Sequence, residues 1–349
     1  MSFALVVSFL LACANPSIED SQPGEIVEPL TAACGHQPVR ALLALPAGEA
    51  WVGCGDGGVL RTLDAGESFE PMHASRQLQV NALALDGDGA LLVCGRDLAS
   101  RGVDALLLRF TERRGWESLL AGASRTDDAC ALLAVDSQGG LALSDTRGDA
   151  LLLRAADAQA WQQPPGWWLG APSQAPRVWD LQSGGGCWFG LGADLVSPPV
   201  FLRPASTQRC LPLRAVAVDP GLAGELWTLA SPDDGEHWLA GGRELRDEAE
   251  SAGVLYRSSP GGERWRPVPL PLGLGWVRDL DFSPSGACGV AVGSRTRPEE
   301  GGFVLVSQDG GRSWQEIDAQ LPPLRVVSVL EQGFLVGGEL GFVGRGRCW

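Results

Sequence analysis

The chain has 349 residues, of which 45% are apolar and 20% charged, and this composition argues against intrinsic disorder. It carries 27 arginines, no lysine and 42 acidic residues, so the formal net charge is −15, which argues against binding nucleic acid. Its 47 glycines and 24 prolines indicate many short strands and tight turns rather than long helices.

The N-terminus has the features of an export signal. Residues 3–12 form an uncharged apolar run that is too short to span a bilayer and ends at Cys13. This run resembles the lipobox of bacterial lipoproteins, although no Lys or Arg precedes it. We therefore expect a signal peptide over residues 1–12, lipidation of Cys13, and a flexible tether over residues 13–33. An ordinary signal peptide with an incidental cysteine is the alternative.

The expected cellular location of the protein is the bacterial cell envelope. A lipid on Cys13 would hold the protein at a membrane surface. Ala14, rather than Asp, follows that cysteine, which in Gram-negative lipoproteins indicates the outer membrane. The sequence therefore predicts an exported outer-membrane lipoprotein.

One pattern recurs along the rest of the chain. An apolar strand is followed by a turn with glycine, a second apolar strand, and a third strand that leads into a polar turn and an aromatic residue. The first strands open near residues 40, 80, 130, 177, 226, 278 and 325. Periods of about 40–50 residues are typical of propeller blades. The sequence therefore predicts an all-β fold, a single seven-bladed β-propeller over residues 34–349.

The last repeat supplies only three strands before the chain stops at Trp349. The segment around residues 26–30 is apolar enough to provide the fourth strand of that blade. We therefore expect the propeller to close by joining its N-terminal and C-terminal strands.

Eight cysteines remain after Cys13, an even number that permits up to four disulfides in an exported chain. We expect Cys34 to pair with Cys348 across the closure, and Cys187 to pair with Cys210 within one blade. Reduced, buried thiols are the alternative for several others: Cys54, Cys94 and Cys130. The three histidines lie far apart and no CxxC motif occurs, so we expect neither a metal site nor a cofactor.

The segment Ser307–Trp314 reads SQDGGRSW and matches the Asp-box of BNR-type β-propellers. Weaker copies occur at Thr62–Phe69 and Ser258–Trp265. In such a turn a short Asp accepts backbone N–H groups, Gly adopts a positive φ, and the aromatic residue packs between sheets. The residues expected to have this structural role are Ser307, Asp309, Gly311, Trp314, Asp64, Gly66, Phe69 and Trp265. Ser231–Trp238 resembles the motif but falls between a first and a second strand.

Arginines recur at the starts of first strands, which line the central channel of a propeller. Arg40, Arg177, Arg278 and Arg325 are therefore predicted to ring one mouth of the channel. Loops on the same face add Arg96, Arg243 and Arg295. Guanidinium groups suit carboxylates, phosphates and glycans, so this face is the predicted binding site. The alternative is that these arginines pair with neighbouring acidic residues and are solvated.

Because sialidases share the Asp-box, a glycoside hydrolase that uses carboxylates at the channel mouth is the alternative function. The single tyrosine, Tyr256, lies on a third strand just before a box, toward the wrong face for a nucleophile. Asp279 and Asp281 could do acid–base work, but carboxylates two residues apart in a strand lie too close to flank a substrate of an inverting enzyme. We expect a protein without catalytic residues.

The chain most resembles the photosystem II assembly/stability factor family in combining export, seven blades, degenerate Asp-boxes and an arginine-bearing face. The resemblance implies a non-catalytic scaffold that binds a client protein, without implying a photosynthetic client. We therefore expect a monomer that binds a protein or a glycan at the arginine-bearing face, contacts the membrane through its lipid, and binds no nucleic acid.

Overall fold

The computed structural model describes most of the chain from residue 28 onward. The described residues are 28–30, 33–55, 58–73, 78–97, 104–120, 130–145, 151–154, 177–193, 198–206, 209–219, 221–247, 250–297, 301–317 and 320–348. The predicted signal peptide, Cys13 and most of the predicted tether lie outside the described residues.

The first three blades follow one another along the chain as antiparallel sheets. The first blade contains β2 (Val39–Ala44), β3 (Ala50–Cys54), β4 (Val59–Thr62) and β5 (Glu70–His73). The second contains β6 (Leu78–Leu85), β7 (Leu91–Asp97), β8 (Asp104–Thr111) and β9 (Gly115–Ser118). Within the described residues the third has three strands: β10 (Cys130–Val135), β11 (Leu141–Asp145) and β12 (Leu151–Arg154).

The next three blades each have four strands. The fourth contains β13 (Arg177–Gly184), β14 (Cys187–Ala193), β15 (Val200–Ser206) and β16 (Arg209–Ala217). The fifth contains β17 (Gly224–Ala230), β18 (Leu239–Asp247), β19 (Glu250–Ser258) and β20 (Trp265–Pro267). The sixth contains β21 (Leu274–Phe282), β22 (Gly289–Arg295), β23 (Gly302–Ser307) and β24 (Gln315–Ile317).

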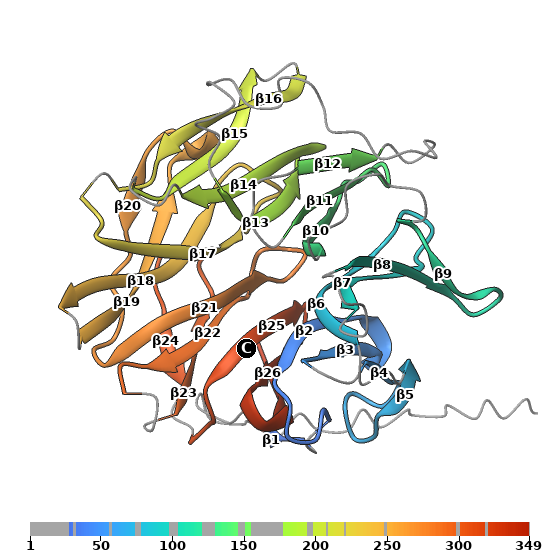
Figure 1. Ribbon diagram of the computed structural model, residues 1–349. Helices are drawn as coiled ribbons and strands as arrows, with labels where there is room; N and C mark the ends of the chain where they lie inside the picture. The colour runs from blue at the N-terminus through green and yellow to red at the C-terminus, as the bar shows by residue number, and fades with distance from the viewer. Residues whose placement is uncertain are drawn as a thin grey trace, which may run out of the picture.

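The seventh blade joins the two ends of the described chain. Its strands are β25 (Leu324–Leu330), β26 (Gly333–Gly338), β27 (Val343–Gly346) and β1 (Glu28–Pro29). β1 runs antiparallel to β27, with Glu28 opposite Arg345. Figure 1 shows the blades in chain order around a ring, the red last blade beside the blue first blade. The predictions of a seven-bladed propeller and of its closure are confirmed, and every predicted blade opening falls within the observed first strand.

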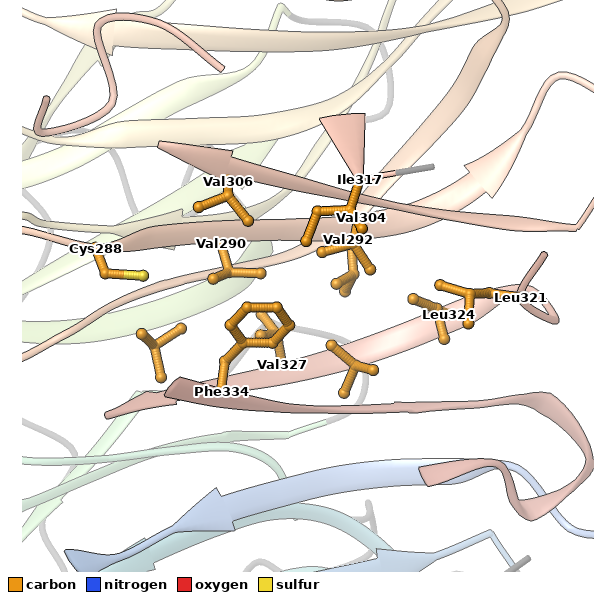
Figure 2. Packing of buried hydrophobic residues seen from close by; sticks show 12 residues of the cluster. Cys288, Val290, Val292, Val304, Val306, Ile317, Leu321, Leu324, Val327 and Phe334 are labelled. Carbon is orange, nitrogen blue, oxygen red and sulfur yellow. The ribbon is translucent and has the colours of Figure 1, made fainter. Parts of the chain in front are cut away.

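Apolar side chains fill the spaces between successive blades. Between the sixth and seventh blades, Val290 and Val304 pack with Val327 and Phe334, as Figure 2 shows. Val290 and Val304 have no exposed surface. Because successive side chains of a strand point to opposite faces, each sheet can pack against both neighbouring blades. The core is therefore divided among the interfaces between blades.

Close packing between blades also explains the glycine that recurs in second strands. A Cβ added at Gly53 of β3 would lie 2.4 Å from a methyl carbon of Val80 in the next blade. A Cβ at Gly337 of β26 would lie 2.5 Å from a methyl carbon of Val39. Glycine lets these strands approach the first strand of the following blade.

The described residues contain four disulfides: Cys34–Cys54, Cys94–Cys130, Cys187–Cys210 and Cys288–Cys348. The predicted Cys187–Cys210 bridge is present, between β14 and β16. Cys94–Cys130 joins the second blade to the third. The alternative of reduced thiols at Cys54, Cys94 and Cys130 is wrong.

The predicted Cys34–Cys348 bridge is also wrong. Leu30 N–H donates to the Val343 carbonyl and Ala33 N–H to the Gly341 carbonyl, so the N-terminal segment runs toward the start of β27. Cys34 lies beyond that end, whereas Cys348 follows the other end of the strand. Each cysteine pairs with a nearer partner, Cys54 or Cys288.

Four disulfides indicate an oxidising, exported location. Among the residues that the structure describes, no helix is long and apolar enough to cross a membrane.

Candidate functional site

Each first strand contains a bulge, in its first half or at its middle, where one residue has no partner in the neighbouring second strand. The pairing with the second strand skips one residue at that point in every blade. The residues skipped at these bulges, in chain order, are Arg40, Asn81, Ala131, Trp179, Trp227, Arg278 and Arg325; β21 also skips Gly275, closer to its start. We call these seven residues the mouth ring.

All seven members of the mouth ring line one central cavity of about 540 Å³. The cavity continues along the first strands as far as Leu85, Val135 and Ser328. A smaller cavity of about 200 Å³ is lined by Arg40, Asn81, Trp227, Arg278, Arg325 and Val326. The bulges therefore bring side chains from seven separate segments to one concave site, as ligand pockets require.

Three of the four arginines predicted at the channel mouth belong to the mouth ring: Arg40, Arg278 and Arg325. Arg177 does not, because the bulge of β13 falls two residues later, at Trp179. The prediction of four equivalent arginines is wrong for the fourth blade. Sequence spacing could not locate the bulge, which depends on the pairing with β14.

Arg278 lies in a stack of arginines and tryptophans. Its guanidinium carbon is 3.5 Å from the centre of the Trp276 ring, and that of Arg243 is 4.1 Å from the same ring. Trp227 and Trp276 have ring centres 5.2 Å apart. Burial, together with Arg325 and Arg243, lowers the pKa of Arg278 to about 10. The rings thus hold two cations close together beside the mouth.

The other predicted arginines have polar partners. Arg96 donates to Gln79, Arg243 to Glu225 at 3.0 Å and Arg295 to Glu316 at 2.5 Å. Arg325 of the mouth ring also pairs with Glu339, at 2.5 Å. Neither Arg96, Arg243 nor Arg295 lines the central cavity. The expected pairing with acidic neighbours holds for Arg243, Arg295 and Arg325.

Three aspartates line the channel below the mouth ring: Asp180, Asp279 and Asp281. Asp279 accepts N–H groups from Leu280 and, in the next blade, from Val327. Burial raises the pKa of Asp180 to about 7, of Asp279 to about 6 and of Asp281 to about 7. The negative charge of Asp279 further raises the pKa of Asp180 and of Asp281.

These aspartates join neighbouring first strands. Asp180 accepts the N–H of Leu229 and Asp281 that of Val329, each from the following blade. First strands have a free edge along the channel, so their N–H groups need such acceptors. The carboxylates of Asp279 and Asp281 are therefore bonded to backbone N–H groups of two neighbouring blades.

Tyr256 lies in β19, inside the packing between the fourth and fifth blades. Its hydroxyl donates to Asp219 at 2.9 Å, and only 6% of the residue is exposed. Burial raises its pKa above the ordinary value. Tyr256 therefore cannot reach a ligand in the channel.

Three turns on the opposite face have the same hydrogen bonds. In Ser307–Trp314, Asp309 accepts the Ser313 N–H at 2.9 Å and the Ser313 hydroxyl at 2.6 Å, while Gly311 N–H donates to Ser307. Asp64 makes the corresponding bonds in Thr62–Phe69. Ser231–Trp238, between β17 and β18, repeats them with Asp233. In Ser258–Trp265, which has Pro260 in place of the aspartate, Ser259 accepts the Arg264 N–H instead.

Among the described residues, Asp233, Glu236 and His237 have possible metal-ligand atoms within 4.8 Å of one another. Asp233 and His237 already bond to each other at 2.5 Å. The group lies in an exposed turn on the face opposite the mouth ring.

Sequence reasoning missed the uncharged members of the mouth ring and Trp276. Each ring member directly follows an apolar residue that is buried in the structure: Val39, Val80, Cys130, Val178, Leu226, Val277 and Leu324. Because each first strand holds other apolar residues as well, this position stands out only once the burial is known, and no signal in the sequence marks it.

No protein-family model matches the chain, and no curated protein is similar to it in sequence. Solved structures are similar to it in fold. YCF48 bound to D1 peptide has 16% identity over 95% of this chain and 98% of that chain, with a TM-score of 0.65. Virginiamycin B lyase from Staphylococcus aureus has 10% identity over 93% and 99%, with a TM-score of 0.67. The GH74 xyloglucanase from Xanthomonas campestris has 18% identity over 91% and 53%, with a TM-score of 0.64. These likenesses show the fold alone, which supports both binding and catalysis.

Proposed function

We propose that this protein is a non-catalytic scaffold that binds an acidic partner, a protein or a glycan, at the mouth ring. One observation carries the proposal: Arg40, Arg278 and Arg325 come from three consecutive blades and line the same small cavity. Their guanidinium groups offer forked donors that match carboxylates and phosphates. In a chain of net charge −15, this local positive charge would direct an acidic group to the mouth.

The comparisons add support for a protein partner, since a propeller similar in fold, YCF48, has been solved with a bound D1 peptide. We also propose that the chain is a member of the BNR/Asp-box propellers, similar to the photosystem II assembly factors. The matching bonds of Asp64 and Asp309 support this assignment. The nature of its own client is not implied by that similarity.

We further propose that the protein is an exported monomer anchored at the outer membrane by a lipid on Cys13. The apolar run before Cys13 and the four disulfides support export. A lipid anchor would leave the mouth ring free to meet partners in the cell envelope.

Glycoside hydrolysis by channel carboxylates is the second candidate. Asp279 and Asp281 line the cavity and have a raised pKa, which is a feature of general acids. Each also accepts N–H groups from two strands, so the carboxylates are engaged in joining the sixth and seventh blades. Turnover of a glycan panel by the native protein, lost in Asp281→Asn, would favour the enzyme.

The binding proposal is tested by capture of envelope components on the immobilised protein. The variant Arg40→Gln/Arg278→Gln/Arg325→Gln should recover much less of any partner, because it removes the cations of the mouth. The matched control is Arg264→Gln/Arg266→Gln/Arg347→Gln, with the same charge change at exposed sites that line neither cavity. Equal recovery by both variants and the native protein would overturn the proposal.

A further inference from the structure

The mouth ring has distinct arcs. Going around from the sixth blade, it presents Arg278, Arg325 and Arg40, then Asn81 and Ala131, then Trp179 and Trp227. A basic arc therefore adjoins an aromatic arc between the sixth and fifth blades. Trp179 keeps 40% of its surface exposed. A ligand that uses both arcs carries an acidic group close to an apolar one.

Apart from the central cavity and the small cavity at its mouth, a separate cavity of about 420 Å³ opens between the fifth and sixth blades, and we call it the second cavity. Its walls are the start of β19, the segment from Pro267 to Leu274, and Thr296 after β22. The apolar side chains in these walls include Val254, Leu255, Val268, Leu270, Leu272 and Leu274. Because these segments lie at the strand ends that meet the start of β21, the cavity opens on the same face as the mouth ring. Leu272 is 96% exposed there.

The arginine–tryptophan stack connects the two cavities. Arg278 of the mouth ring lies over the Trp276 ring, and Trp276 Nε1 donates to Ser251 Oγ at 3.0 Å. Ser251 belongs to the wall of the second cavity. The path from the Arg278 guanidinium to Ser251 covers these two contacts, of 3.5 Å and 3.0 Å, and the Trp276 ring between them, so an extended chain at ~3.3 Å per residue crosses it in roughly three to five residues.

Within the described residues, one edge of β19 has no partner strand beside the second cavity, and the Thr296 hydroxyl donates to the Ser251 carbonyl there at 3.3 Å. β20 pairs with Tyr256–Ser258 only, and Val268 N–H donates to the Leu255 carbonyl. Beyond this point, among the described residues, no strand pairs with Ser251–Val254 on that side of the sheet. Such an edge can bind an extended polypeptide through main-chain hydrogen bonds, an arrangement that a glycan cannot reproduce.

We infer that the mouth ring and the second cavity form one site for an acidic segment of a partner protein. An acidic side chain enters the small mouth cavity, whose volume of about 200 Å³ suits a single side chain. The segment crosses the stack along β19 and places an apolar side chain in the second cavity. The inference rests on the proposed function and narrows its partner from protein or glycan to polypeptide.

The test is selection from a random dodecapeptide display library on the immobilised protein. Enriched peptides should share an Asp or Glu separated by roughly three to five residues from an apolar residue. Leu272→Asp places a negative charge at the edge of the second cavity and should bind the enriched peptides roughly tenfold more weakly. Leu63→Asp is the matched control, since Leu63 is an exposed leucine in the Thr62–Phe69 turn of the opposite face.

The outcomes separate this inference from the proposed function. Enrichment of an acidic residue alone, unaffected by Leu272→Asp, would overturn the inference and leave the proposed binding face standing. Enrichment that survives Arg40→Gln/Arg278→Gln/Arg325→Gln would overturn both. Absence of peptide enrichment, with arginine-dependent binding of oligogalacturonate on a glycan array, would identify a glycan partner and overturn the polypeptide assignment.

Discussion

Asp309 closes the turn between β23 and β24 with several hydrogen bonds from its own segment. It accepts the N–H groups of Arg312 and Ser313 and the hydroxyls of Ser307 and Ser313. Although partial burial opposes this effect, these bonds lower the pKa of Asp309. The carboxylate is thus bound in its charged form and stabilises the turn at neutral pH.

Asp309→Ala should lower the free energy of unfolding by about 1–2 kcal/mol, because the turn loses its acceptor. Chemical denaturation of the native protein and the variant measures the difference. Ser313→Ala, which removes one of the donors, is the control and should cost less. A variant that keeps full stability but loses partner binding would contradict the structural role.

The channel aspartates have the opposite electrostatic behaviour, because burial raises their pKa. The pKa of Asp281 is about 7 in the folded protein against 3.8 as its ordinary value, so the folded state holds a proton that the unfolded state releases. The stability from this group is fully present below about pH 4 and is lost as the pH rises to about 7. Asp281→Asn should flatten the dependence of stability on pH within this window, as denaturation at several pH values would measure. An unchanged slope would contradict the raised pKa.

Among the elements, the first strands of neighbouring blades are joined along the channel wall by hydrogen bonds in which a side chain is the donor or the acceptor. Asn81 donates to the Cys130 carbonyl, Ala44 N–H donates to Ser328, and the aspartates accept from the following blade. Disulfides add covalent links at other points. Cys288–Cys348 attaches the C-terminal segment to the sixth blade, whereas Cys187–Cys210 stays within the fourth.

Removal of Cys288–Cys348 should destabilise the propeller more than removal of Cys187–Cys210. Cys288–Cys348 joins residues that are 60 positions apart in the sequence, whereas Cys187–Cys210 joins residues that are 23 positions apart. Loop-closure entropy then gives losses of about 4 and about 3 kcal/mol for the paired Cys→Ser variants. Thermal unfolding of the two double variants compares them. Greater stability of the Cys288→Ser/Cys348→Ser variant would show that attachment of the C-terminal segment adds less than the intrablade link.

At the scale of the whole molecule, charge and attachment determine which partners can reach the mouth. The net charge of −15 would repel most acidic surfaces, so only a segment that reaches the basic arc would gain attraction. A lipid on Cys13, as we propose, would keep this surface within reach of the membrane.

Cys13→Ser should release the protein from the membrane into the soluble fraction, because the lipid has no attachment point. Detergent phase partitioning of the exported protein measures the change. Cys288→Ser/Cys348→Ser is the control, since it removes cysteines without affecting the lipidation site. Retention of the Cys13→Ser variant in the detergent phase would contradict the anchor.

The fold was predictable because it depends on local patterns that repeat. Alternating apolar strands, glycine turns and a constant period determine seven similar blades, and the missing strand of the last repeat determines closure by β1. The bonds around Asp64 and Asp309 were predictable for the same reason, since each aspartate bonds within its own turn.

Only the tertiary structure decided which side chains share a site. A bulge shifts the phase of a strand by one residue, and its position depends on the partner strand, so spacing could not choose Trp179 over Arg177. The pairing of Cys34 with Cys54 depends likewise on the direction in which β1 crosses the last blade. Asp279 and Asp281 join two blades because segments 48 residues apart in the chain meet at the channel wall. Such contacts link distant segments, whose meeting is set by the closed ring rather than by any local pattern.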